Sequence, residues 1–171
     1  PGPTYRPDLP NFKDRFEMLS EDFEGEIYSW SCDSIFKEYP IGAFVYRGLL
    51  CRSEGLKRKW LLAKHIVSNA FRYNKTGKVD VIVCFEPMFT GVIAVVLRIF
   101  LRAKLIIEVN SSDIGGSSQF ARTGFAGQCK YQINRMLSLF SLSFTDGIRV
   151  LTEFSRDRLL KRFPRKKIFC F

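Results

Sequence analysis

Three short apolar runs constrain the fold more than any other feature of this chain. They are rich in β-branched residues, and such nearly continuous runs are typical of strands covered on both faces. The runs are 79–85 (VDVIVCF), 104–109 (KLIIEV) and 147–151 (GIRVL). Segments with helical periodicity follow them: from Thr90 or Gly91 to Arg102, 129–142 and 152–162. Covered strands alternating with helices predict a parallel sheet with right-handed crossovers, the doubly wound α/β class.

The remaining elements are predicted from patterns of the same kind. Apolar residues at helical spacing predict helices, and short β-branched or aromatic runs predict strands. The expected helices are 11–21 and 56–73, and the expected strands are 25–31, 42–49 and a last one beginning at 167. A polar, Pro-ended connection joins the first two strands, and 110–125 is a long polar loop.

Length and cysteine content favour a single domain that needs neither disulfide bonds nor a structural metal ion. With 171 residues, 46% of them hydrophobic, the chain is long enough to bury a sizeable core. The cysteines are odd in number, far apart and without a Cys-x-x-Cys pair, so neither a disulfide framework nor a zinc site is expected. They are Cys32, Cys51, Cys84, Cys129 and Cys170. We expect them to be small buried apolar residues of a protein in a reducing, cytoplasmic compartment.

The charge predicts an anionic partner. A formal net charge of +10 attracts nucleic acid, acidic lipid or a phosphorylated substrate. Nucleic acid is the least favoured, because no recognised binding motif is present and the aromatic residues lie mainly in apolar stripes and strands. The longest apolar stretch, 79–101, is interrupted by Asp80, Glu86, Pro87 and Arg98, so it is not expected to span a membrane.

The predicted sheet also selects candidate site residues. In open parallel sheets, ligands bind beyond the carboxyl ends of the strands. The polar residues that follow the predicted strands are Glu86, Asn110, Ser111, Asp113, Thr152, Glu153 and Ser155. We expect these side chains to gather along one edge of the sheet.

Two stretches of the same region resemble a known enzyme family. Residues 79–112 (VDVIVCFEPMFTGVIAVVLRIFLRAKLIIEVNSS) are similar to the middle of the N-terminal domain of family 4 glycosyltransferases, where a strand ends in a Glu-Pro turn and the next strand delivers a polar site residue. Residues 147–168 (GIRVLTEFSRDRLLKRFPRKKI) are similar to the end of that domain. The opening, 1–20, resembles the loop and helix that follow the family's first strand.

This resemblance implies a two-lobed, GT-B-type enzyme whose lobes are Rossmann-like. The N-terminal lobe holds the acceptor, and the C-terminal lobe binds a nucleotide-sugar donor. Such enzymes generally retain anomeric configuration and use neither a metal nor a further cofactor. Residues 1–171 would form the acceptor-binding domain alone, without the family's first strand and without the donor-binding lobe, and would be inactive by themselves. The alternative is a non-catalytic acceptor-lobe subunit that needs a separate donor-binding chain.

The resemblance assigns roles to the candidate residues. Asn110 stands where many members carry a histidine near the reacting sugar; because asparagine takes no proton near neutral pH, positioning suits it better than general-base catalysis. Asp113 is a candidate for acceptor contact or for the general base. The candidates for acceptor contact alone are Glu86, Ser111, Thr152, Glu153 and Ser155. The loop near the donor phosphates corresponds to Gly2, Tyr5 and Arg6.

Each candidate also suits an ordinary structural role. Asn110 and Asp113 are typical turn residues, and Glu86 suits a solvated carboxylate. Thr152, Glu153 and Ser155 begin a predicted helix, where a hydroxyl is first of all an N-cap; the amides of the same turn also bind anions. Both readings stay open for each residue.

A peripheral membrane surface is the last candidate. Basic residues lie beside aromatic or aliphatic ones on two predicted helices, which suits an anionic membrane at its inner, cytoplasmic face; a solvated helix face is the alternative. The residues are Lys57, Arg58, Lys59, Trp60, Arg98 and Arg102. The single histidine, His65, lies beside an apolar stripe and is expected to be structural.

Overall fold

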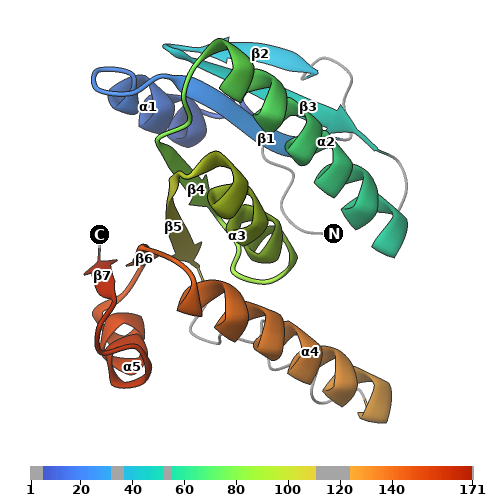
Figure 1. Ribbon diagram of the computed structural model, residues 1–171, viewed down its shortest axis with the longest axis vertical. Helices are drawn as coiled ribbons and strands as arrows, with labels where there is room; N and C mark the ends of the chain where they lie inside the picture. The colour runs from blue at the N-terminus through green and yellow to red at the C-terminus, as the bar shows by residue number, and fades with distance from the viewer. Residues whose placement is uncertain (1–5, 32–36, 52–54, 111–123, 171) are drawn as a thin grey trace. The chain divides into compact units, whose positions relative to one another are not determined.

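The chain has an α/β fold, which confirms the general class predicted from the sequence. The strands of its parallel sheet follow one another in sequence order, however, and not in the order of a doubly wound sheet. A computed structural model describes residues 6–31, 37–51, 55–110 and 124–170 (Figure 1). The chain divides into two compact units, Pro1–Asn69 and Ala70–Phe171. Each unit has a sheet of its own, mixed in the first and entirely parallel in the second.

The first unit contains sheet A, whose strand order is β1-β3-β2. The strands β1 (Gly25–Ser31) and β3 (Phe44–Leu50) are parallel and lie where the sequence predicts them. The strand β2 (Glu38–Ile41), antiparallel to β3, lies in the predicted connection, so that prediction was wrong for this segment. Its Pro40 argued against a strand, but β2 is at the edge of the sheet, where a residue without an N–H group is tolerated.

Sheet A packs between two helices. The helix α1 (Pro10–Leu19) begins with proline in its first turn, where the missing N–H costs nothing. Its Phe16 is buried and lies with its ring 5.3 Å from that of Phe44. The helix α2 (Gly55–Thr76) contacts β3 through His65, whose Nε2 lies 3.3 Å from the carbonyl oxygen of Arg47. The structural role expected for this histidine is therefore confirmed.

The second unit contains sheet B, with strand order β4-β5-β6-β7 and every pair parallel. Its strands are β4 (Val81–Cys84), β5 (Lys104–Val109), β6 (Gly147–Val150) and β7 (Lys167–Cys170). The helices α3 (Phe89–Leu101), α4 (Gly124–Ser143) and α5 (Glu153–Arg162) connect them. Because the strands follow one another in sequence order, right-handed crossovers place all three helices on the same face.

The core of this unit fills the space between sheet B and those helices. It comprises alternate residues of the strands together with small and aliphatic residues of the helices. The buried members are Cys84, Leu105, Ile107, Val109, Ile148 and Val150 from the strands, and Ala94, Val95, Leu142 and Leu159 from the helices. Burial of these side chains is the main stabilising contribution.

The opposite face of β4 is partly open. Val81 and Val83 remain 42% and 47% exposed, so the prediction that 79–85 is covered on both faces was wrong for this strand. A β-branched run favours a strand whether one or both faces are buried. The apolar run alone therefore did not report on how the edge strand is covered.

The helices α3 and α4 approach closely through small residues. A Cβ at Gly91 would lie 2.9 Å from Ser141 Oγ, 3.0 Å from Ser141 Cβ and 3.1 Å from the carbonyl oxygen of Glu86. Ser141 is fully buried, and its Oγ lies within hydrogen-bonding distance of the carbonyl oxygens of Pro87 and Ser138. This contact fixes which face of α4 points inward.

Asp146 stabilises sheet B at the amino ends of its strands. Its carboxylate accepts a hydrogen bond from the backbone N–H of Leu105 (2.9 Å) and another from Arg98 (3.0 Å), and Lys104 Nζ lies 3.6 Å away. Burial acts to raise the pKa of Asp146, but the hydrogen bond from Leu105 and the charges of Arg98 and Lys104 outweigh it and lower the pKa below its ordinary value. Asp146 therefore joins β5, β6 and α3.

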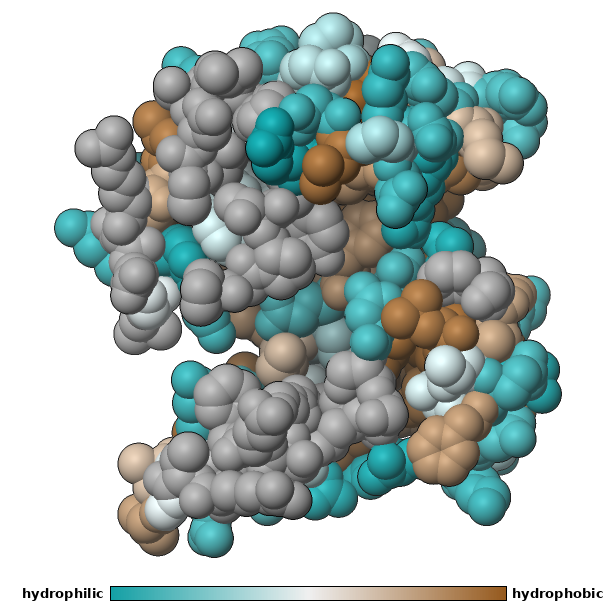
Figure 2. All heavy atoms as spheres, turned by 180° about the vertical axis from the view of Figure 1, so that it is seen from behind, coloured by the Kyte–Doolittle hydropathy of each residue, from teal (hydrophilic) through white to brown (hydrophobic). Residues whose placement is uncertain are grey.

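The cysteines described by the structure are free but not all buried. Cys51 and Cys84 are buried and Cys170 is half-buried, whereas Cys129 is exposed. The prediction of burial was wrong for Cys129, because α4 turns it outward together with other apolar side chains. Apolar atoms reach the surface where α4 begins, at the lower left of Figure 2.

We expect the thiols of Cys129 and Cys84 to differ strongly in alkylation by iodoacetamide. Burial raises the pKa of Cys84 to about 11, which lowers its thiolate fraction at pH ~8 by roughly two orders of magnitude relative to an ordinary thiol, and burial also blocks access. Mass spectrometry of peptides from the folded protein should find rapid modification of Cys129 and protection of Cys84 until denaturant is added. Equal modification rates would contradict the packing of β4.

Candidate functional site

The register of sheet B brings the ends of three strands to one edge. Cys84 pairs with Ile107, and Val109 pairs with Val150, all in parallel ladders. The residues that follow these strands therefore lie along the same side of the sheet, where the carboxyl ends of the strands meet. This side is called the carboxyl edge. The structure places Glu86 after β4, Asn110 after β5 and Thr152 after β6 on that edge.

Asn110 links two of these strand ends directly. It is exposed, and its Nδ2 donates to the carbonyl oxygen of Phe85 across 3.5 Å. This contact joins the exit of β5 to the exit of β4 and orients the amide, leaving Oδ1 as its hydrogen-bond acceptor. The asparagine thus presents a polar group at the end of β5.

Glu86 lies on a turn that is fixed by its own backbone. Its carbonyl oxygen accepts hydrogen bonds from Thr90 Oγ1 (3.1 Å) and from Cys84 Sγ (3.0 Å). These contacts hold the Glu-Pro turn between β4 and the first turn of α3. The half-buried side chain of Glu86 therefore starts from a well-anchored backbone.

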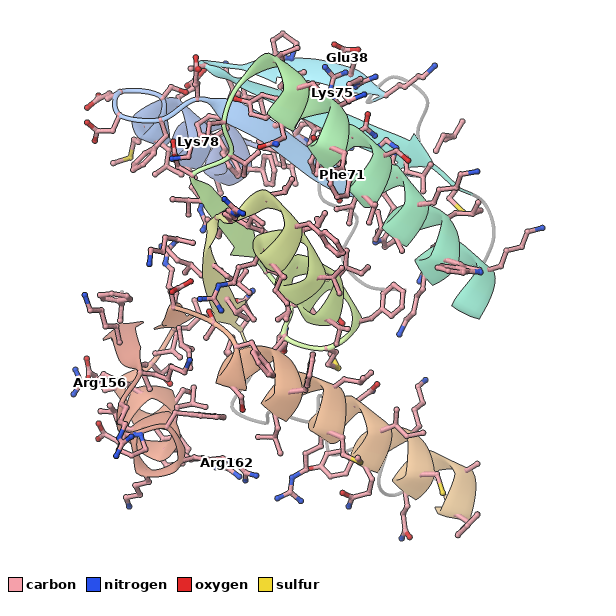
Figure 3. All side chains as sticks on the ribbon, viewed as in Figure 1. Glu38, Phe71, Lys75, Lys78, Arg156 and Arg162 are labelled. Carbon is pink, nitrogen blue, oxygen red and sulfur yellow. The ribbon has the colours of Figure 1, made fainter. Side chains whose placement is uncertain are left out.

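The residues after β6 have structural roles at the start of α5. Thr152 is the N-cap, and its Oγ1 accepts a hydrogen bond from the backbone N–H of Ser155 at 3.2 Å. The Ser155 hydroxyl is buried and accepts from Thr152 Oγ1 at 2.9 Å. Glu153 is exposed and forms an ion pair with Arg156, which extends from α5 in Figure 3. The N-cap reading of Thr152 is confirmed.

Two charged residues that the sequence pattern did not single out lie just before the carboxyl ends of β5 and β6. Glu108 of β5 and Arg149 of β6 are register partners, with Arg149 Nη1 3.5 Å from Glu108 Oε2. The Glu108 side chain is 4% exposed and that of Arg149 31%. A buried charge is retained only when it is paired. The signal in the sequence was a charged residue among the apolar residues of each run, Glu108 in 104–109 and Arg149 in 147–151.

Several predicted site residues lie outside the described ranges. They are Gly2, Tyr5, Ser111 and Asp113, so their donor-loop, acceptor and general-base roles stay predictions. Arg6 is described in the first unit, where its guanidinium donates two hydrogen bonds to Asp8, at 3.1 and 2.6 Å. Its role at the donor phosphates likewise stays a prediction.

The residues predicted to contact a membrane differ in how firmly they are held. In the first unit, Lys57, Lys59 and Trp60 are exposed, whereas the guanidinium of Arg58 lies over the ring of Trp30 at 4.4 Å. In the second unit, Arg98 is engaged by Asp146 and by the carbonyl oxygen of Phe144, and Arg102 is exposed at the end of α3. Among the residues described, no helix has both the length and the apolar character to cross a bilayer.

Comparison with known proteins adds no assignment. No protein-family model matches the chain, and no curated protein has a similar sequence. The residues at the carboxyl ends of the strands, and the two stretches around them, are therefore the features that point to a function.

Proposed function

We propose that this chain is the acceptor-binding domain of a retaining, GT-B-type glycosyltransferase. The reaction moves a sugar from a nucleotide-sugar donor to a glycan or lipid-linked acceptor at the cytoplasmic face of a membrane, and a second, donor-binding lobe holds the nucleotide. The observation that carries the proposal is the position of Glu86 and Asn110 on neighbouring strand ends of the parallel sheet. In α/β folds this is the edge at which ligands bind.

The chemistry of these residues suits the recognition of sugar hydroxyls. The carboxylate of Glu86 accepts hydrogen bonds, and hydrogen bonds to a charged group are stronger than neutral ones. Asn110 offers Oδ1 as a further acceptor, because its Nδ2 bonds the carbonyl oxygen of Phe85. Holding the acceptor hydroxyl in place lowers the entropic part of the barrier to transfer. Deprotonation of that hydroxyl is left to Asp113 or to the donor itself.

The pair Glu108–Arg149 supports the same edge from beneath. It lies one residue before Val109 and Val150, the last residues of β5 and β6. The carboxylate of Glu108 holds the Arg149 guanidinium on the face opposite the core cluster. We propose that this pair fixes the ends of the two strands that carry Asn110 and Thr152.

A second candidate function is that of a non-catalytic acceptor lobe. Asn110 favours it, because this residue stands where the family resemblance implies a histidine and cannot act as a base near neutral pH. Such a subunit would bind the acceptor and work only when docked to a separate donor-binding chain. Transfer measured in the presence of the donor-binding lobe tests the catalytic alternative: loss of transfer in an Asp113→Asn variant that still binds the acceptor would show that this chain supplies the base and is not a non-catalytic lobe.

We expect the whole chain to bind acceptor-type sugars but not uridine diphosphate. A panel of mono- and disaccharides should shift the backbone amide NMR signals of residues 85–86, 110 and 151–152. Glu86→Gln and Asn110→Ala should each weaken binding by about tenfold, because the first replaces a charged hydrogen-bond acceptor with a neutral one and the second removes the acceptor.

The matched control is Asp80→Asn. Asp80 is an exposed carboxylate at the amino end of β4, paired with Lys78, and its loss should leave binding unchanged. Binding of uridine diphosphate by this chain alone, or sugar-induced shifts confined to the amino edge near Asp80 and Asp146, would overturn the proposal.

A further inference from the structure

A basic hollow lies at the amino ends of the strands of sheet B, away from the carboxyl edge. It has a volume of about 290 Å³ and lies within the second unit, where α3 ends and β5 begins. The described residues that line it are Arg98, Ile99, Arg102, Ala103 and Lys104. Three of these five are cations and none is acidic. A concave surface lined by charges of one sign concentrates ions of the opposite sign, so the hollow is a candidate binding site for an anion.

Arg98 is held in place before any ligand arrives. Its Nη2 donates to the carboxylate of Asp146 at 3.0 Å, and its Nη1 bonds the carbonyl oxygen of Phe144. The side chain is 30% exposed, so it is recessed but open to a small molecule. A side chain that is already ordered loses little conformational freedom on binding, which favours affinity.

The cations of this region share a single carboxylate. Asp146 pairs with both Arg98 and Lys104, at 3.0 and 3.6 Å. Behind them, Lys166 Nζ donates to the carbonyl oxygen of Thr145 at 2.5 Å. The pKa of Lys166 is lowered, first by burial and then by the charge of Arg98, whereas the charge of Asp146 opposes the change. A further anion in the hollow would offset this excess of positive charge.

Arg102 adds a third cation from a backbone conformation that favours glycine. It is the C-cap of α3, with φ 53°, and no other non-glycine residue in the described part of the chain has a positive φ. Glycine is the usual residue at a left-handed helix end, and a larger residue costs free energy there. One compensation is structural, because a cation interacts favourably with the carboxyl end of a helix. The other is contact with a ligand in the hollow.

We propose that this hollow binds the phosphate group of a compact, soluble phosphate monoester. Such a group carries a charge of about −1.5 to −2 near neutral pH, which suits three converging cations. Arginine matches phosphate oxygens with paired hydrogen bonds, and lysine adds a point charge. The volume is below the ~300–1,000 Å³ of sites for drug-sized ligands, so a nucleoside diphosphate is too large. The inference does not depend on sugar transfer.

The same phosphate chemistry occurs on the headgroup of phosphatidic acid. Arg98 is drawn back against Asp146 and the carbonyl oxygen of Phe144. A compact anion that enters the hollow reaches this guanidinium more easily than the flat surface of a bilayer does. The geometry therefore favours a soluble ligand over a lipid.

The experiment is a titration of the whole chain with inorganic phosphate, with the ionic strength held constant by sodium chloride. We expect saturable shifts of the backbone amide NMR signals of residues 98–104 and 146, and no shift at 85–86 or 151–152. Glycerol 3-phosphate should give the same pattern, and glycerol should give none. Arg102→Gln and Lys104→Gln should each weaken binding at least about fivefold, because each removes a charge-assisted hydrogen bond.

The matched control is the double substitution Lys161→Gln/Arg162→Gln. Both residues are exposed cations of α5 that do not line the hollow, and Arg162 is labelled in Figure 3. Their removal lowers the net charge by as much as Arg102→Gln/Lys104→Gln does. General attraction of phosphate to a basic protein would weaken equally in both double variants. A site in the hollow is weakened only by the second.

Arg102→Gly separates a ligand-binding role from support of α3. Because glycine suits a positive φ, the urea midpoint should rise or stay the same, whereas phosphate binding should weaken as much as in Arg102→Gln. A lower midpoint with unchanged phosphate binding would instead assign this arginine to the helix end and would contradict the inference.

Three further results would overturn it. The first is the absence of saturable shifts at residues 98–104. The second is equal weakening of phosphate binding by the two double substitutions. The third is binding to vesicles that contain phosphatidic acid without binding of inorganic phosphate or glycerol 3-phosphate, which would assign the cations to a lipid surface.

Discussion

Replacing Gly91 with valine lowers the free energy of unfolding of the second unit by roughly 2–4 kcal/mol, the combined cost of overpacking and lost hydrogen bonds. The new side chain would occupy the space of Ser141, whose Cβ lies 3.0 Å from the position of the new Cβ. Ser141 would then lose its contacts with the carbonyl oxygens of Pro87 and Ser138. Urea unfolding followed by circular dichroism measures the change.

Two further variants show whether the contact with Ser141 is the cause. Gly91→Ala should destabilise less than valine, and a Ser141→Gly background should remove most of its cost, because it deletes both atoms that the new methyl group meets first. Gly77→Ala is the control, since a Cβ there meets nothing within 4 Å. If Gly91→Val is as stable as the parent chain, α3 and α4 do not pack as the structure shows.

Asp146→Asn is expected to lower stability by roughly 1–3 kcal/mol at neutral pH, the usual range for a hydrogen bond to a charged group. The change removes the charge that faces Arg98 and Lys104 and weakens the bond from the N–H of Leu105. Urea unfolding of parent and variant at pH ~7 measures this difference. Asp80→Asn should change stability far less, because Asp80 and Lys78 are an exposed pair.

The pH dependence of this difference has a definite sign. The pKa of Asp146 is lower in the folded chain than its ordinary value, so its contribution is fully present above the pKa of the unfolded chain, about 3.9. The contribution is lost as the pH falls through the folded pKa. The stability gap between parent and Asp146→Asn should therefore shrink on acidification. A gap that widens below pH ~4 would show that the carboxylate is not stabilised by its neighbours.

Much of the fold could be predicted because it depends on local pattern. The runs at 104–109 and 147–151 are rich in β-branched and apolar residues, which favour a buried strand over other conformations. The structure places β5 and β6 there. The helical spacing of apolar residues likewise predicted α3 and α5. The beginning of α4 at Gly124, earlier than the predicted 129, was missed because glycines weaken a helical pattern.

The candidate site was predictable only in outline. The rule that ligands bind beyond the carboxyl ends of parallel strands is enough to predict that Glu86, Asn110 and Thr152 lie close together. The pairing of Glu108 with Arg149 could not be predicted from the sequence, because it depends on which residues of β5 and β6 lie opposite each other. Register is set by the packing of the whole sheet, and a shift of either strand by one residue would place its charge on the core face.

The amino-acid sequence by itself determined the α/β class, the parallel direction of the strands of sheet B, and the end of that sheet at which the polar residues after the strands lie. These properties follow from periodicity and from the handedness of crossovers, which act within a few residues or one βαβ unit. Only the tertiary structure decided that Pro40 lies in an edge strand, that β4 is open on one face, and that α4 turns apolar side chains outward. Each of these depends on contacts between residues distant in the chain, such as Gly91 with Ser141, which no local pattern encodes.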